Sequence, residues 1–156
     1  MGIDALRFAP LIVYLVIGGQ LSLIDFRTHR LPNRLVAMCT LLMLALQVAY
    51  CLWIGSGTDL SRAGLTAGKI FAAYVVLYLF SRGQLGMGDV KFAVPVGLLV
   101  GWYNPDGWLI SLLLTFLLAG VVGVIGLLTG KLDRKSNIPF GPYMYVGSII
   151  TVLMGM

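Results

Sequence analysis

Charged side chains are scarce in this chain. Only 11% of its 156 residues are Asp, Glu, Lys or Arg, whereas 59% are hydrophobic. Since charged residues make up ~25% of an average soluble domain, this composition excludes an ordinary soluble fold. It indicates a protein that crosses a lipid bilayer several times.

Cysteine and histidine are also rare, with two cysteines and one histidine in the whole chain. Cys39 and Cys51 lie in one apolar stretch, and on a helix their separation of about 18 Å exceeds the reach of a disulfide. No cluster of cysteines and histidines surrounds His29 in the sequence, so we expect no metal ion and no other cofactor. The cysteines are interpreted as small buried hydrophobic side chains.

Six apolar stretches with short connections make up most of the chain. A helix needs about 20 residues to cross a hydrocarbon core of ~30 Å, and these stretches approach that length. They predict an all-α protein, a bundle of six transmembrane helices in a single domain over residues 1–156, with the first helix retained rather than cleaved as a signal peptide. The stretches run approximately over Leu6–Ile24, Leu35–Ile54, Leu65–Phe80, Leu85–Tyr103, Trp108–Leu128 and Ile138–Met156.

The net charge of +5 is unevenly distributed along the chain. Cytoplasmic loops of membrane proteins are enriched in Lys and Arg, so the first, third and fifth connections are predicted to face the cytoplasm and both termini the outside. This orientation in the cytoplasmic (inner) membrane explains the basic charge without a nucleic-acid partner. Eight of the eleven cations support it: Arg27, Arg30, Arg34, Arg82, Lys91, Lys131, Arg134 and Lys135.

The fourth apolar stretch is interrupted near its start. From Phe92 to Tyr103 it offers twelve uncharged residues, which make only about 18 Å of helix. The segment can cross the membrane only if it includes residues 86–91, which places Asp89 about one turn below the cytoplasmic surface. Pro95 is expected to kink or loosen this helix.

Two of the six acidic residues, Asp25 and Asp89, fall at the same predicted depth on the cytoplasmic side. One interpretation is structural: Asp89 caps the fourth helix, and Asp25 pairs with the arginines that follow it. An aspartate near the centre of a span costs about 3 kcal/mol, however, and a serine or asparagine caps a helix without that cost. We therefore favour a functional interpretation of the pair.

The chemistry of such a pair follows from electrostatics. Two ionised carboxylates ~4 Å apart repel by about 4 kcal/mol at an effective dielectric constant of about 20, so they share one proton near neutral pH. One carboxylate then takes a proton from water while the other donates a proton to a peptide carbonyl oxygen, as in aspartic proteases. Which of the two residues is the base stays open.

Two glycines, Gly86 and Gly88, precede Asp89. Without Cβ atoms they permit backbone conformations and close approaches that other residues forbid, so we expect a substrate strand to lie against this segment. A bulky residue at position 88 is predicted to abolish cleavage and to leave the fold intact.

Three short motifs follow one another along the chain: DFRTHRLPN at 25–33, GMGDVK at 86–91 and IPFGPY at 138–143. GMGDVK resembles the Gly-x-Gly-Asp signature of membrane aspartic proteases, in the form found in type IV prepilin peptidases, and the other two motifs resemble further segments of that family. The resemblance implies that Asp25 and Asp89 are catalytic. It also implies a prepilin-like or archaellin-like substrate with a hydrophobic N-terminal helix, whose short basic leader is removed at the cytoplasmic face.

Larger members of this family carry an extra N-terminal region, often with cysteine pairs, and also methylate the new N-terminus. This chain begins at the first catalytic segment and has no CxxC motif. It therefore resembles the small, peptidase-only members that serve Flp/Tad pili or archaella, and methyl transfer is not expected.

Other residues near the motifs have two interpretations each. Lys91 stands two positions from Asp89, so on a helix it points elsewhere, and we interpret it as an interfacial anchor in preference to a substrate contact. Four residues ahead of the sixth stretch either break the chain there or shape the floor of the active site: Pro139, Phe140, Gly141 and Pro142.

Two further functions fit parts of the sequence. Paired carboxylates inside a membrane also relay protons, as in a small proton-coupled transporter or channel component, although interior polar residues are sparse here. A membrane scaffold would use small-xxx-small contacts, and GLTAG at 64–68 and GLLVG at 97–101 are predicted to pack helices closely. Processing of a precursor by the wild type, and its loss without Asp25 or Asp89, separates a peptidase from both.

Overall fold

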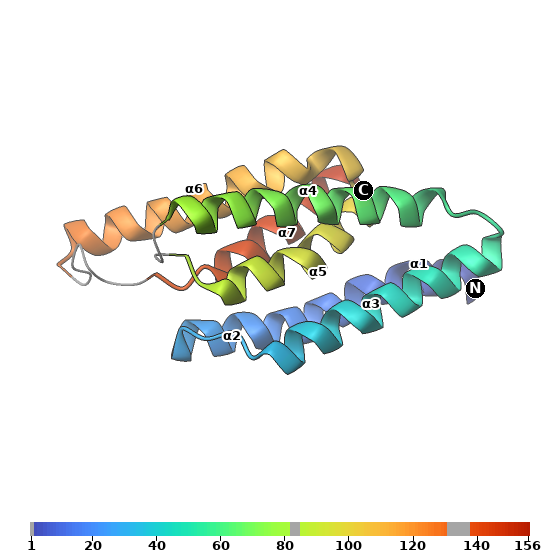
Figure 1. Cartoon of the computed structure of the whole chain (residues 1–156), viewed down its shortest axis with the longest axis horizontal. Coiled ribbons are helices and arrows are strands. Elements are labelled where there is room, and N and C mark those ends of the chain that lie inside the picture. Colours follow the sequence, from blue (N-terminus) through green and yellow to red (C-terminus); the bar gives the residue numbers. More distant parts are fainter. Residues whose placement is uncertain (1, 82–84, 131–137) are drawn as a thin grey trace.

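The computed structural model describes residues 2–81, 85–130 and 138–156. Within these ranges the chain forms six helices and no strand (Figure 1). The first is continuous from α1 (Gly2–Val13) through a π-helical segment (Tyr14–Gly18) to α2 (Gly19–Thr28). The others are α3 (Asn33–Ile54), α4 (Thr58–Phe80), α5 (Met87–Tyr103), α6 (Trp108–Leu128) and α7 (Gly141–Gly155), with a short 3-10 turn (Pro105–Gly107) before α6.

The predicted all-helical architecture is therefore confirmed, with four helices long and apolar enough to cross a membrane. These are Ala5–Thr28, Asn33–Ile54, Thr58–Phe80 and Pro105–Leu128. The remaining two, α5 and α7, have 17 and 15 residues. Since about 20 residues are needed to cross the hydrocarbon core, complete spanning by α5 and α7 stays a prediction.

The helices alternate in direction. In Figure 1, α2, α4 and α6 end on the left side of the view, where α3, α5 and α7 begin, while the N-terminus and the α3–α4 connection lie on the right. The helix ends that the first, third and fifth connections join thus lie at one end of the bundle, as an alternating topology requires. The side of the membrane that this end faces remains a prediction from charge, and Arg82, Lys131, Arg134 and Lys135 lie outside the described residues.

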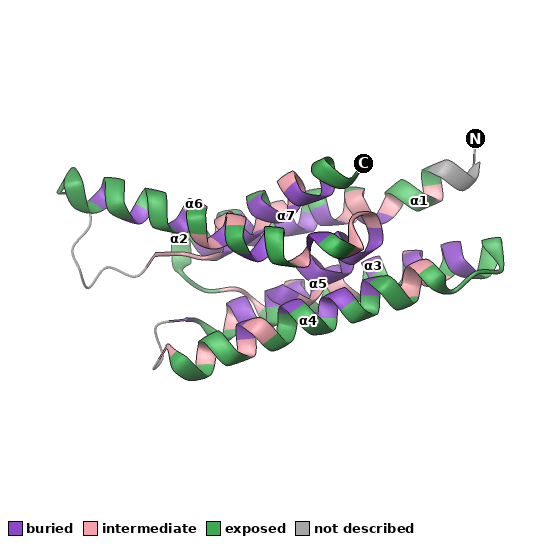
Figure 2. Ribbon diagram, turned by 90° about the horizontal axis from the view of Figure 1, so that it is seen from above, coloured by how far each residue is buried: buried purple, intermediate pink, exposed green. Residues whose placement is uncertain are grey.

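Helix α5 forms the centre of the bundle, between α3, α4 and α7 (Figure 2). Every residue from Val96 to Trp102 is buried. The helix begins at Met87, so residues 88–91 join it as predicted, and it continues as an α-helix through the buried Pro95. The expected loosening at Pro95 therefore does not interrupt the helix.

Glycines let α4 and α5 approach closely. A Cβ atom on Gly101 would lie 2.6 Å from Cβ of Thr66 and 2.7 Å from Cα of Ala63, and a Cβ on Gly97 would overlap the backbone of Ala67. The packing predicted for GLLVG is thus confirmed.

The prediction for GLTAG is wrong within this chain. A Cβ on Gly64 or Gly68 would meet nothing within 4 Å, because both glycines face away from the bundle. The small residues that α4 presents to α5 are Ala63 and Ala67, one position earlier. Buried Ile70 and Tyr74 continue this face along α4 and so fix its helical register.

Candidate active site

Asp25 lies in the last turn of α2, with only 4% of its surface exposed. Its Oδ2 accepts a hydrogen bond of 2.8 Å from the backbone N–H of Gly141, at the start of α7. The helix ends shortly after it because His29 adopts the left-handed conformation (φ 51°), where its N–H still bonds to the Asp25 carbonyl. Arg27 and Arg30 are exposed, and in the described part of the chain the buried carboxylate is bonded by Gly141 and forms no ion pair with the arginines that follow it.

Asp89 lies in the first turn of α5 and is 7% exposed. Its Oδ2 accepts a hydrogen bond of 3.2 Å from the backbone N–H of Gly86, and its own N–H donates to the Gly86 carbonyl at 3.1 Å. Gly86 is the N-cap residue of α5, and Asp89 stands three positions later. The structural interpretation of Asp89 is thus correct in part, because its side chain does support the start of the helix.

Both aspartates line one open cavity of about 380 Å³ at the end of the bundle where α2 ends and α5 begins. The cavity brings together most of the residues that the sequence singled out: Asp25, Gly86, Gly88, Asp89 and Lys91. Five residues that sequence reasoning did not select complete its wall: His29, Arg30, Leu31, Asn33 and Met87.

The glycines beside Asp89 serve close packing and not unusual backbone angles. Gly86 has an ordinary extended conformation (φ −72°, ψ 141°), and Gly88 is helical. A Cβ on Gly88 would lie 3.0 Å from Cβ of Leu31, and a Cβ on Gly86 would lie 3.1 Å from Oδ2 of Asp89. A leucine at position 88 does not fit without displacing Leu31, so the expectation that such a variant keeps its structure intact is not supported.

Lys91 contacts α3 instead of Asp89. Its Nζ donates a hydrogen bond of 3.0 Å to Oδ1 of Asn33, the first residue of α3. The prediction that Lys91 and Asp89 point to different faces is consistent with this bond. Asn33 could have been selected from the sequence, since it is the last residue of the motif DFRTHRLPN.

Residues 139–142, where α7 begins, both start the last helix and reach the site. Pro142 occupies the first turn of α7, where its fixed φ suits a helix start, and Gly141 contacts Asp25. Phe140 packs against Phe116 of α6, with ring centroids 5.6 Å apart. Of the four residues predicted here, Gly141 therefore lies at the site, Phe140 lies next to it, and no contact of Pro139 with the carboxylates is seen in the described part of the chain.

An apolar hollow of about 320 Å³ adjoins this segment. Its wall includes Leu85 and Phe140, the residues immediately before Gly86 and Gly141. The two glycines whose backbone N–H groups hold the carboxylates are therefore direct chain neighbours of two residues in the wall of this hollow. The remaining residues of its wall are Leu77, Phe80, Ser81 and Phe116.

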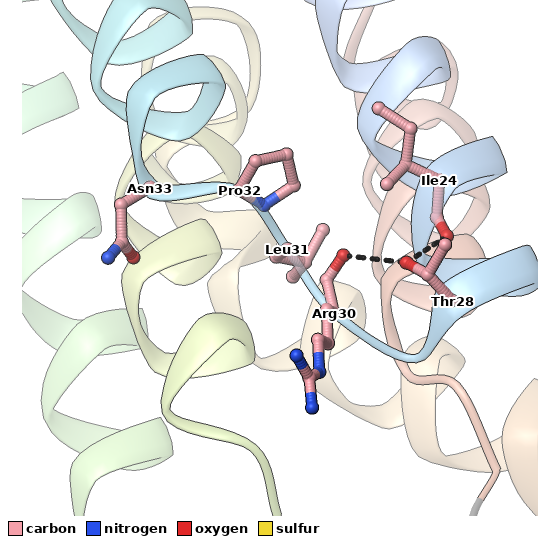
Figure 3. A pocket seen from close by; sticks show the side chains of 6 residues that line it. All are labelled: Ile24, Thr28, Arg30, Leu31, Pro32 and Asn33. Carbon is pink, nitrogen blue, oxygen red and sulfur yellow. Dashed lines mark hydrogen bonds between the residues drawn. The ribbon is translucent and has the colours of Figure 1, made fainter.

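A wider groove of about 760 Å³ lies where α2 passes into α3 (Figure 3). Thr28 shapes the turn, since its Oγ1 donates to the carbonyl oxygens of Ile24 at 2.8 Å and Arg30 at 3.3 Å. Figure 3 shows the Arg30 side chain directed away from α2 and α3. Arg30, Leu31 and Asn33 line both this groove and the aspartate cavity, so the two lie next to each other.

This arrangement is suited to general acid–base chemistry. Each carboxyl group is held through Oδ2 by a backbone N–H at the start of a helix, and in the described part of the chain no hydrogen bond to its Oδ1 is seen. Two carboxyl groups on one cavity can transfer protons to and from the same bound molecule. Among the residues that the structure describes, no group of three or more His, Cys, Asp or Glu side chains is placed to hold a metal ion.

Comparison with known proteins places these features in a family context. Residues 12–128 match the model of the type IV leader peptidase family. The chain is 25% identical over 154 residues to the prepilin leader peptidase/N-methyltransferase of Bacillus subtilis, covering 97% of this chain and 58% of the relative. It is 32% identical to the protein of the same name from Burkholderia pseudomallei (86% and 43% covered) and 30% identical to that from Escherichia coli (91% and 61% covered).

The chain spans about half the length of the curated relatives it matches. No solved structure matches it.

Proposed function

Because this chain belongs to the type IV leader peptidase family, we propose that it is a membrane aspartic endopeptidase that cuts prepilin-like precursors. It removes a short basic leader from a substrate with a hydrophobic N-terminal helix, at the cytoplasmic face of the membrane. Asp25 and Asp89 are its catalytic pair, and water is the nucleophile. The proposal covers removal of the leader only.

The observation that carries this proposal is the shared cavity of Asp25 and Asp89. Two buried carboxyl groups that face one cavity hold a single proton between them, since ionising both would cost several kcal/mol at short range, ~4 kcal/mol for a separation of 4 Å. This leaves one group as a base and the other as an acid at the same time.

The reaction then proceeds in two steps. In the first, the ionised carboxylate takes a proton from water while the oxygen of that water attacks the carbonyl carbon of the scissile peptide, and the protonated carboxyl gives its proton to the carbonyl oxygen. In the second, the tetrahedral intermediate returns a proton through the pair to the leaving amine, and the C–N bond breaks. The products are a new carboxyl terminus on the leader and a new amino terminus on the mature protein.

The surroundings of the cavity support a membrane-embedded substrate. The apolar hollow beside Leu85 and Phe140 provides an environment for hydrophobic residues close to both carboxylate anchors. The adjoining groove along Arg30 and Leu31 provides an open surface at the same end of the bundle. A precursor with one apolar helix and a polar leader meets both kinds of surface.

The test is co-expression of a tagged prepilin with wild type, Asp25→Asn or Asp89→Asn, followed by measurement of precursor size. Asp106→Asn is the matched control, because Asp106 is exposed and outside the cavity. The wild type and the control should convert the precursor, and both site variants should lose conversion. A proton-coupled transporter or a scaffold would leave the precursor size unchanged in every strain.

A further inference from the structure

We propose that Gly141 is the positioning residue of Asp25: its backbone N–H, presented by the N-terminus of α7, fixes the carboxyl group in its reactive orientation. This inference rests on the proposed function in that the orientation matters for catalysis. It assigns to α7 a specific part in the reaction, distinct from packing.

The hydrogen bond is short, buried and formed across the fold. Gly141 N–H donates to Asp25 Oδ2 at 2.8 Å, and 116 positions separate the two residues. The first N–H groups of a helix have no partner inside the helix and carry the positive end of its dipole. The start of α7 therefore offers a directed donor to a carboxylate that has little contact with solvent.

The absence of a side chain at position 141 is required by the same contact. A Cβ there would lie 2.8 Å from Oδ2, 3.0 Å from Cβ and 3.1 Å from Cγ of Asp25. All three nearest atoms belong to one residue. Because the Cβ of Asp25 is fixed to α2, an added methyl group must move the carboxyl group, α2 or α7.

Helix α7 is held in place independently of Asp25. Three hydrogen bonds connect it to two other parts of the chain, the π-helical segment of the first helix and Asn104 after α5, so its N-terminus is a fixed support to which the carboxyl group conforms. The bonds join Ser148 Oγ to Tyr14 Oη at 2.7 Å, Tyr145 Oη to the Leu15 carbonyl at 3.0 Å, and the Thr151 carbonyl to Asn104 Nδ2 at 3.0 Å.

Asp89 is held in a different way. Its anchor, Gly86, is three residues away, so the hydrogen bond that holds Asp89 lies within the start of α5. The orientation of Asp25 depends on where α7 stands relative to α2. A change confined to the start of α7 should therefore impair Asp25 and spare Asp89.

The test compares three Gly→Ala variants of the purified protein in kcat, KM and melting temperature on a synthetic precursor. Gly141→Ala carries the clash with Asp25. Gly147→Ala perturbs the packing of the same helix, since its Cβ would lie 3.0 Å from Oγ1 of Thr115. Gly120→Ala is the neutral control, because its Cβ would meet nothing within 4 Å.

Gly141→Ala should lower kcat by at least about tenfold with KM within about twofold, because substrate binding is not the step affected. Gly147→Ala should lower the melting temperature and leave the kcat of the folded enzyme near that of wild type. Gly120→Ala should leave kcat unchanged and should not lower the melting temperature. An equal loss of kcat in Gly147→Ala and Gly141→Ala would show a general effect of α7 packing and would overturn the proposal.

A backbone substitution removes the donor without adding atoms. Glycolic acid incorporated in place of Gly141 replaces the N–H by an ester oxygen, and loss of a hydrogen bond to a charged group should reduce kcat by about ten- to a hundred-fold. A kcat equal to that of wild type in this variant would contradict the proposal.

Carboxyl ¹³C NMR of Asp-labelled protein gives a readout that does not need activity. The resonance lost in Asp25→Asn identifies Asp25, and it should shift in the glycolic acid variant while that of Asp89 stays. If the wild type cut no precursor and this shift still occurred, the proposed function would fail while the hold of Gly141 on Asp25 would stand. An unchanged Asp25 resonance in the glycolic acid variant would contradict the positioning role itself.

Discussion

One pair of glycines lies at the start of α5 and a second pair lies in its second half, and the two pairs have different roles. At its start, the space left by Gly86 and Gly88 is occupied by the Asp89 carboxyl group and by Leu31. In its second half, the space left by Gly97 and Gly101 is occupied by the α4 backbone. The same small residue therefore admits a reactive group and a loop at one end of the helix and a neighbouring helix at the other.

The two ends also differ in burial. The second half is enclosed on all sides, whereas Met87 and Lys91 at the start are exposed and the open cavity begins between them. Close helix packing holds α5 firmly by its second half, so its first turn can present Asp89 to the cavity. The comparison predicts that substitutions in the second half damage the fold, and that substitutions in the first turn damage catalysis.

The largest effect is expected for Gly101→Leu. Its side chain would have to enter space occupied by Thr66 and Ala63, whose nearest atoms lie 2.6 and 2.7 Å from the position of a Cβ. Overpacking against backbone should lower the free energy of unfolding by at least ~3 kcal/mol, measured by denaturation in detergent. Gly64→Leu is the control, because nothing lies near that site. Equal free energies of unfolding for Gly101→Leu and Gly64→Leu would contradict the claim that close packing of α5 against α4 stabilises the fold.

A smaller and different effect is expected for Gly88→Ala. The added methyl group would lie 3.0 Å from Cβ of Leu31, so the loop before α3 must shift by a few tenths of an ångström. Since a misplacement of ~1 Å can cost ~10²-fold in rate, processing should fall by about tenfold. The melting temperature should not fall, because Ala is better than Gly in a helix by about 1 kcal/mol.

Leu31→Gly combined with Gly88→Ala removes the clash, and it should regain part of the lost rate. A Gly88→Ala enzyme that is as active as wild type would show that the first turn of α5 tolerates a side chain and that catalysis does not depend on the close approach of Leu31.

The smallest effect is expected for Lys91→Met. It removes an exposed hydrogen bond to Asn33, worth about 0.5–1.5 kcal/mol, so processing should stay within about threefold of wild type. Asn33→Ala removes the same bond from the other side and should match it. If Lys91→Met abolished processing and Asn33→Ala did not, Lys91 would be a substrate contact and not an anchor.

Much of the helical framework could be predicted from hydrophobicity and local chemistry. The predicted boundaries of the fifth stretch, Trp108–Leu128, coincide with those of α6, and α3 ends at Ile54 as predicted. At Ile54 the signal is local, because Gly55 adopts a positive φ of 72° that few other residues accept. The first helix instead continues past Ile24 to Thr28, since its last turn contains the buried Asp25, which is satisfied by a distant partner.

The meeting of Asp25 and Asp89 on one cavity could be anticipated because alternating spans return both residues to the same depth. The hydrogen-bond partner of each carboxyl group could not be anticipated. The bond from Gly141 joins positions 116 apart, and nothing in a local pattern specifies it. The outward direction of Gly64 and Gly68 likewise depends on the register of α4, which a four-residue spacing leaves undetermined.

Asp25 and Asp89 are proposed to act as one catalytic unit, and a double-mutant cycle is the sharpest test of this coupling. Initial rates of precursor cleavage would be measured for purified wild type, Asp25→Asn, Asp89→Asn and the double variant at equal folded concentration. Each single variant should lose about 10²–10⁴-fold in rate and the double variant should lose no more, because a unit fails when either member is removed. Losses that multiply in the double variant, or a single variant that cleaves at the wild-type rate, would contradict this coupling.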